Sequence, residues 1–179
     1  MLSSDKAVLV VIDIQGKLAQ SMYRKELLFE NLQKIIKGAQ ILEVPVIITE
    51  QNPKGLGPTI PEIAALIPHF QPIPKFSFSC CGDERFTKEL KALQRRQVLL
   101  AGIETHVCVY QTTVDLVASG YGVHVIADAV SSRTAENRDI GLQMMRDAGA
   151  SITSVEAALF ELLRVAEGPR FKEIIRVVK

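Results

Sequence analysis

The sequence lacks most of the features that mark secreted, membrane-bound and nucleic-acid-binding proteins. Its 179 residues include three cysteines, three histidines and no tryptophan. A small, odd number of cysteines does not make the disulfide framework of a secreted domain. No CxxC, HxH or HExxH spacing offers ligands for zinc. We therefore expect a protein with reduced thiols, no metal and no cofactor.

An excess of charge of either sign is also absent. The chain has 21 Lys and Arg against 20 Asp and Glu, a net charge of +1, so no overall field attracts nucleic acid or an anionic membrane. The apolar run Ala7–Ile12 near the N-terminus is too short for a signal-peptide core or a membrane span. These absences predict a cytoplasmic protein without nucleic-acid or membrane partners, and they disfavour a ribonuclease.

What is present is the composition of an ordinary globular domain. Hydrophobic residues make up 47% of the chain and charged residues 23%. A chain of this size buries roughly 70% of its unfolded surface, which is enough to fold without disulfides or a metal. A single domain over residues 1–179 is therefore expected.

Apolar runs typical of buried strands alternate with apolar stripes at the helical period. Helical spacing is clearest over residues 28–42, 107–117 and 135–148. The alternation predicts a doubly wound α/β fold with a mostly parallel, six-stranded sheet and helices on both faces. The expected strands lie at residues 7–14, 44–49, 71–78, 98–103, 123–127 and 150–153. The strand at 71–78 contains Pro72 and Pro74, which cannot donate ladder hydrogen bonds, so it belongs at a sheet edge.

Ligands of an open parallel sheet bind beyond the carboxyl ends of its strands, and several reactive side chains stand there. Asp13 closes the first strand, Lys75 falls in the proline-bracketed strand, and Cys108 opens the helix after the fourth strand. The helix dipole and a nearby lysine would favour the Cys108 thiolate. The alternative is that Cys108 is an inert buried thiol, and we interpret Cys80 and Cys81 as structural or incidental.

Three segments carry a combination of residues that points to a known family. They are Val-Val-Ile-Asp-Ile-Gln at residues 10–15, Lys75 after a strand, and Ala-Gly-Ile-Glu-Thr-His-Val-Cys-Val at residues 101–109. Together they resemble the isochorismatase-like cysteine hydrolase superfamily. Thr-Glu-Gln-Asn-Pro-Lys-Gly-Leu-Gly at residues 49–57 and Asp-Ala-Val-Ser-Ser-Arg at residues 128–133 are similar to the subgroup of isochorismatase domain-containing proteins.

This resemblance implies a catalytic triad of Asp13, Lys75 and Cys108. It also implies a cis peptide bond between Ile103 and Glu104, with the backbone N–H groups of Glu104 and Cys108 forming an oxyanion hole. The metal-binding nicotinamidases of the superfamily carry an aspartate and histidines after the second strand. This chain has Glu-Gln-Asn-Pro at residues 50–53 instead, so no metal is implied.

The residue types then predict a cysteine hydrolase that cleaves an amide-type C–N bond of a small molecule through a thioester on Cys108. From their positions, Gln51 and Phe76 are expected to line the substrate site. Isochorismatase itself lacks this cysteine, so the family name does not give the substrate. The alternative is a catalytically silent or scaffold member of the fold that binds a small ligand.

A homo-oligomer, a dimer or larger, is also expected. Phe171, Ile174, Ile175 and Val178 continue an apolar helical stripe to the last residues of the chain, where a monomer is usually polar. The alternative is that this stripe packs on its own domain.

Overall fold

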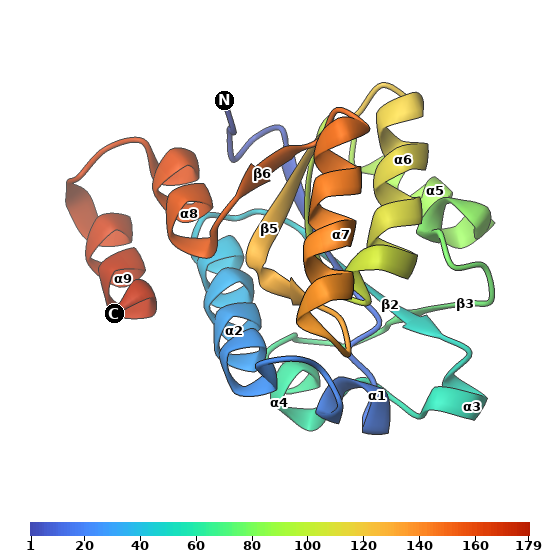
Figure 1. Cartoon of the computed structure of the whole chain (residues 1–179). Helices are drawn as coiled ribbons and strands as arrows, with labels where there is room; N and C mark the ends of the chain where they lie inside the picture. The colour runs from blue at the N-terminus through green and yellow to red at the C-terminus, as the bar shows by residue number, and fades with distance from the viewer.

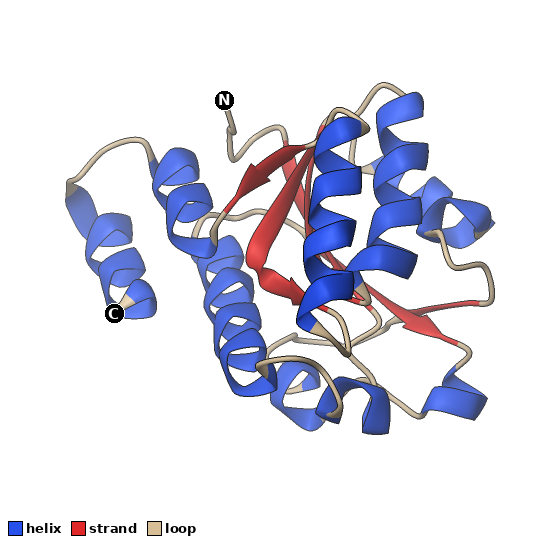
Figure 2. Ribbon diagram, in the orientation of Figure 1, coloured by secondary structure: helices blue, strands red, loops and turns tan.

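The structure, a computed structural model, describes residues 1–179 as a six-stranded sheet covered by helices (Figures 1 and 2). All neighbouring strands pair in parallel, in the order β3-β2-β1-β4-β5-β6. The predicted doubly wound α/β class is confirmed, and the sheet is fully parallel. Its strands are β1 (Ala7–Ile12), β2 (Val46–Gln51), β3 (Ile73–Lys75), β4 (Gln97–Ile103), β5 (Gly122–Ser131) and β6 (Ser151–Thr153).

Nine α-helices and two short helical turns connect and cover the strands. None of these helices combines the length and the apolar composition that crossing a bilayer requires. The α-helices are α1 (Gly16–Gln20), α2 (Lys25–Ile41), α3 (Pro53–Leu56), α4 (Pro61–Ala64), α5 (Glu84–Ala92), α6 (Tyr110–Ala118), α7 (Ala135–Asp147), α8 (Val155–Leu163) and α9 (Gly168–Val178). The short turns are a 3₁₀ turn at Cys80–Gly82 and a π-helical turn at Thr105–Val109.

Each face of the sheet has its own apolar core, because successive strand residues point to opposite faces. In β1, Leu9 and Val11 pack with side chains of α2, α8 and α9. Val10 and Ile12 pack on the other side, with side chains of α5, α6 and α7. Figure 1 shows α2, α8 and α9 together on one side of the sheet, and α6 and α7 together on the other.

The C-terminal helix α9 packs along α2 and α8 (Figure 1). Ile174 is fully buried in the core that α2 and α8 share, and Phe171, Ile175 and Val178 are half-buried. The apolar stripe that suggested an oligomer is therefore used largely within the chain. The apolar stripe of α9 is therefore not by itself evidence that the protein forms an oligomer.

Two strands, β3 and β5, differ most in length from their predicted spans. β3 is the edge strand, as its prolines predicted, but it covers only Ile73–Lys75, since the chain leaves the sheet after Lys75. β5 continues to Ser131, beyond the predicted end at residue 127. Its register against β4 shifts between Leu100 and Gly102, and this irregularity separates the predicted part of β5 from its extension.

The candidate site lies where the direction of chain winding reverses. β1 is central and pairs with β2 on one side and β4 on the other. The loops that follow β1 and β4 therefore diverge, and a crevice forms beyond the carboxyl ends of these two strands. This position brings Asp13, after β1, close to Cys108, after β4.

Candidate active site

Asp13 and Lys75 form a buried ion pair at the centre of the site. Asp13 follows β1 with φ of 57°, in the left-handed region. Its Oδ2 lies 2.7 Å from Lys75 Nζ, and the exposed fractions of the two residues are 1% and 0%. Thr49, in β2, donates a hydrogen bond of 2.8 Å to Asp13 Oδ1. Both carboxylate oxygens are thus held, which fixes the orientation of the Asp13 side chain.

The Lys75 ammonium is surrounded by oxygen atoms. Besides Asp13, Nζ donates to Gln51 Oε1 at 2.7 Å, to the Phe78 carbonyl at 3.0 Å and to the Ser77 carbonyl at 3.2 Å. An ammonium has three protons to donate, so its hydrogen-bonding capacity is fully used inside the protein. Lys75 therefore stabilises the buried Asp13 carboxylate and has no proton left for a ligand.

Cys108 lies in the π-helical turn Thr105–Val109, which runs directly into α6. Its residue surface is 7% exposed, and it lines the same cavity as Asp13. The sequence-based interpretation placed Cys108 in the first turn of an α-helix. A wider π turn is present instead, which sets the thiol on the wall of the cavity.

The peptide bond between Ile103 and Glu104 is cis, as the resemblance implied. The Glu104 carbonyl accepts hydrogen bonds from the N–H groups of Val107, at 3.0 Å, and Val109, at 3.2 Å. The Glu104 N–H itself donates to no acceptor of the chain. It is therefore free to donate to a bound oxygen atom.

The protonation state of Cys108 differs from the prediction. Burial and, next, the negative charge of Asp13 raise the pKa of the Cys108 thiol to about 12, whereas Lys75 opposes the rise. The sequence suggested that a helix end and the lysine would favour a thiolate. In the structure the lysine is already paired with Asp13, so burial and the carboxylate dominate and Cys108 is a thiol.

The cavity beside Cys108 has a volume of about 100 Å³. Gln51 lines it, as the sequence predicted, but Phe76 does not: its side chain is 76% exposed. Neighbouring residues of an extended chain point to opposite sides. Because Lys75 points inward, Phe76 points outward. Phe78 lies beyond the end of β3 at Lys75 and lines the cavity instead. The other lining residues are Asp13, Leu18, Leu56, Ile103, Glu104 and Val107.

Sequence reasoning missed two buried polar residues that hold the site together. One is Thr49, which donates to Asp13. The other is Gln15, whose side chain accepts from the Gln51 N–H at 2.7 Å and donates to the carbonyls of Gln51, at 3.1 Å, and Gly57, at 2.7 Å. Both are polar residues at or beside strand ends in otherwise apolar segments, and that signal could have identified them.

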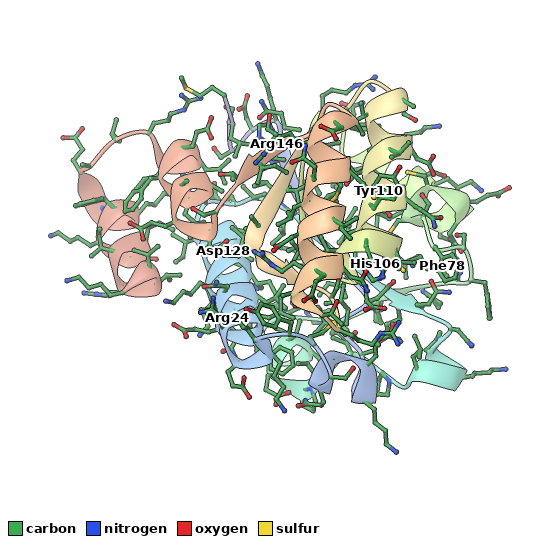
Figure 3. The ribbon with its side chains drawn as sticks, in the orientation of Figure 1. Arg24, Phe78, His106, Tyr110, Asp128 and Arg146 are labelled. Atoms are coloured by element: carbon green, nitrogen blue, oxygen red, sulfur yellow. The ribbon has the colours of Figure 1, made fainter.

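The other acids at strand ends serve the fold. Glu50 Oε1 accepts from both the N–H and the hydroxyl of Thr59, at 2.7 and 2.8 Å. Asp128 Oδ1 accepts from the Val155 N–H at 2.9 Å, at the start of α8. Figure 3 shows Asp128 beside α2 and away from Phe78. No group of three or more histidine, cysteine, aspartate or glutamate side chains is arranged to hold a metal ion.

Cys80 is a second buried thiol close to the site, with Sγ 3.8 Å from Thr49 Oγ1. Burial raises its pKa from an ordinary value of about 9 to about 12. Below about pH 9 the Cys80 thiol is protonated in both the folded and the unfolded protein, and stability is highest there. Between pH 9 and 12 the thiol ionises in the unfolded chain but not in the folded one, so the free energy of unfolding falls.

We therefore expect the free energy of unfolding to fall by about 1 kcal/mol more in wild type than in Cys80→Ala between pH 9 and pH 10. Urea titrations of both proteins at the two pH values measure this difference. Cys81→Ala should differ from wild type in a similar way, because burial raises the pKa of the Cys81 thiol to about 11. Equal slopes for wild type and Cys80→Ala would contradict the expectation.

Comparison with known proteins gives consistent matches over nearly the whole chain. A model of the isochorismatase domain matches residues 7–157. The isochorismatase domain-containing protein 2 of Xenopus laevis is 40% identical, over 99% of this chain and 85% of its own. A secreted isochorismatase effector, Isc1, of Phytophthora sojae is also 40% identical, over 97% of this chain and 84% of its own.

Solved structures agree with this fold. The MAR1 ribonuclease from Caenorhabditis elegans superposes with a TM-score of 0.92 at 38% identity, covering 99% of this chain and 91% of its own. YcaC from Pseudomonas aeruginosa, solved with hexane-2,5-diol and covalent acrylamide, gives a TM-score of 0.92 at 25% identity, covering 98% and 90%. YcaC from Escherichia coli, an octameric hydrolase of unknown specificity, gives 0.93 at 24% identity, covering 98% and 88%.

Proposed function

The chain belongs to the isochorismatase family, and we propose that it is a cysteine hydrolase that cleaves an amide-type C–N bond of a small molecule through a thioester on Cys108. One observation carries the proposal: a thiol and a carboxylate held by a buried lysine line one small cavity. A nucleophile with a base beside it and a third group that orients the base is the arrangement that nucleophilic catalysis requires.

In the first half of the reaction, the Cys108 sulfur attacks the carbonyl carbon while the thiol proton moves to the Asp13 carboxylate. Because burial and Asp13 raise the pKa of the thiol, Asp13 accepts the proton as the sulfur attacks. The carbonyl oxygen becomes negative and accepts hydrogen bonds from the N–H groups of Glu104 and Cys108. The C–N bond then breaks, Asp13 returns its proton to the leaving nitrogen, and a thioester remains on Cys108.

In the second half, Asp13 removes a proton from water, and the resulting hydroxide attacks the thioester carbonyl. The same N–H groups stabilise the negative oxygen. The C–S bond breaks, the sulfur recovers the proton from Asp13, and the acid leaves. Lys75 stays charged throughout, because it compensates the Asp13 carboxylate each time that this carboxylate is restored.

Relatives supply both support and two competing functions. The covalent acrylamide on the Pseudomonas aeruginosa protein agrees with a cavity that delivers a small amide to a nucleophile. The ribonuclease name of the Caenorhabditis elegans relative favours RNA cleavage, and a silent ligand-binding scaffold is the other alternative. The net charge of +1 and the small cavity argue against RNA.

Ammonia release from a panel of small amides, ureido acids and nicotinamide tests the proposal, with RNA as a parallel substrate. Hydrolysis of at least one small amide that Cys108→Ala lacks is the expected result. RNA cleavage that Cys108→Ala abolishes, with no amide hydrolysed, would favour the ribonuclease. Binding without turnover of any compound would favour the scaffold.

We expect the hydrolysis to be independent of metal ions. The only acid beside Gln51 at the end of β2 is Glu50, and Thr59 already holds its Oε1. Activity should therefore survive dialysis against a strong chelator. Loss of turnover on dialysis, followed by recovery on adding zinc, would contradict this expectation.

We also propose that the protein is a homo-oligomer. The support is the octameric state of the Escherichia coli structure with the same fold, since α9 uses its apolar stripe inside the chain. Light scattering at micromolar concentration should give a multiple of the chain mass. A mass of 19.7 kDa, that of one chain, would contradict it.

A cytoplasmic location remains a prediction, and the Phytophthora sojae relative is a secreted protein.

A further inference from the structure

The size of the cavity restricts what can reach Cys108. Its volume is about 100 Å³. Sites for drug-sized ligands usually measure about 300–1,000 Å³. An amide group with a short chain fills such a space, whereas an aromatic amide would leave its ring outside.

The walls of the cavity are largely apolar. Five of its lining side chains are aliphatic or aromatic, namely Leu18, Leu56, Phe78, Ile103 and Val107. The Gln51 side chain, although polar, is engaged on both of its ends, with Lys75 at 2.7 Å and with the Phe76 carbonyl at 2.8 Å. A bound molecule therefore meets apolar surface except at the reacting group.

No lysine or arginine is among the residues that line the cavity. Lys75 lies behind the wall, fully buried, with its three protons directed at oxygen atoms of the protein. Arg133 stands outside, with its side chain 61% exposed, and binds Glu104 Oε2 through both its N–H and its Nε, at 3.0 and 3.2 Å. A carboxylate on a substrate would find no partner inside the cavity.

Two residues that line the cavity are acidic, Asp13 and Glu104, and their carboxylates are already paired with Lys75 and Arg133. A substrate carboxylate would come close to these negative charges without a cation of its own, so both repulsion and desolvation would oppose its binding. An uncharged amide avoids both costs. Its hydrolysis produces a carboxylate in the same place, so the repulsion that excludes a charged substrate also promotes release of the product.

We propose that this site selects short, uncharged aliphatic amides and rejects molecules that carry a carboxylate next to the reacting group. The proposal rests on the hydrolase function proposed above. It names the substrate class from the geometry of the cavity and the fixed positions of its charges. Ureido acids and N-carbamoyl amino acids are therefore excluded as substrates.

Iodoacetamide and iodoacetate test the charge rule, because they match in size and differ in charge. Both form an S–C bond with release of iodide, and the thiol proton passes to Asp13 or to buffer. For each reagent, the rate of Cys108 modification at pH 7 is divided by the rate of the same reagent with glutathione, which corrects for the different intrinsic reactivity of the two reagents. We expect the amide to be favoured at least tenfold over the acid after this correction. A neutral but bulky reagent, N-phenyl iodoacetamide, should also react slowly.

Two variants assign the discrimination to Glu104. Glu104→Gln removes one lining charge and should lower the preference for the amide at least threefold. Arg133→Met removes the positive charge that pairs with the Glu104 carboxylate, so it should raise the preference for the amide. A corrected ratio near one in wild type, or an unchanged ratio in both variants, would overturn this inference and leave the hydrolase proposal intact. Failure of both small reagents to modify Cys108 would overturn both proposals.

Discussion

Replacing Cys108 with alanine should reduce amide hydrolysis by a factor on the order of 10⁵–10⁶, as expected when a nucleophile is lost. Wild type should also form a covalent adduct with acrylamide, as the Pseudomonas aeruginosa relative does, and the variant should form none. The structure gives the reason: Cys108 is the only thiol that lines the cavity beside Asp13. Rates of ammonia release and the adduct measured by intact-protein mass spectrometry provide the two readouts.

The matched control is Cys81→Ala, which removes a half-buried thiol outside the cavity. It should keep both its activity and its adduct. A Cys108→Ala protein that retains a tenth of the wild-type rate would show that another group attacks the carbonyl, and the thioester mechanism would be wrong.

Replacing Lys75 with methionine should destabilise the fold by about 3–5 kcal/mol, the usual consequence of removing one partner of a buried ion pair. Lys75 and Asp13 are 0% and 1% exposed, so the variant leaves an uncompensated carboxylate in the interior. The Asp13 carboxylate would protonate or draw in water, and either change would remove the catalytic base. Urea unfolding measures the loss of stability, and ammonia release measures the loss of activity.

Lys88→Met is the control, because Lys88 pairs with Glu84 at 3.5 Å on the surface and both side chains are more than three-quarters exposed. It should change stability by less than about 0.5 kcal/mol. The double variant Asp13→Asn with Lys75→Met should recover part of the lost stability, since it removes the unpaired charge. A loss of less than about 1 kcal/mol in Lys75→Met would contradict a buried, ionised pair.

The sequence was sufficient to predict the fold class and where Asp13 and Cys108 lie. Parallel strands that are apolar on both faces have a clear pattern, and their carboxyl ends meet at one edge of the sheet. Lys75 could be placed because the prolines around it marked an edge strand. These predictions depended on the order of apolar residues and prolines within single segments, which can be read without knowing how the segments pack.

Properties that depend on packing were predicted less well. The direction of Phe76 follows from where β3 ends, and no local pattern marks that point. The protonation of Cys108 follows from a balance between burial, Asp13 and Lys75, and that balance is set by three segments distant in sequence. Thr49 is marked as a polar residue in an apolar segment, but its contact with Asp13 depends on the pairing of β2 with β1.

The most direct test of the account is to locate the acyl group during turnover. A reaction with a short amide is quenched in acid, and the protein is digested with trypsin. Cys108 is the single cysteine of the peptide spanning residues 97–133, and Cys80 and Cys81 share the peptide spanning residues 76–85. The account predicts an acyl group on the first peptide only, sensitive to hydroxylamine as a thioester is. Turnover with no acyl group on that peptide would contradict it.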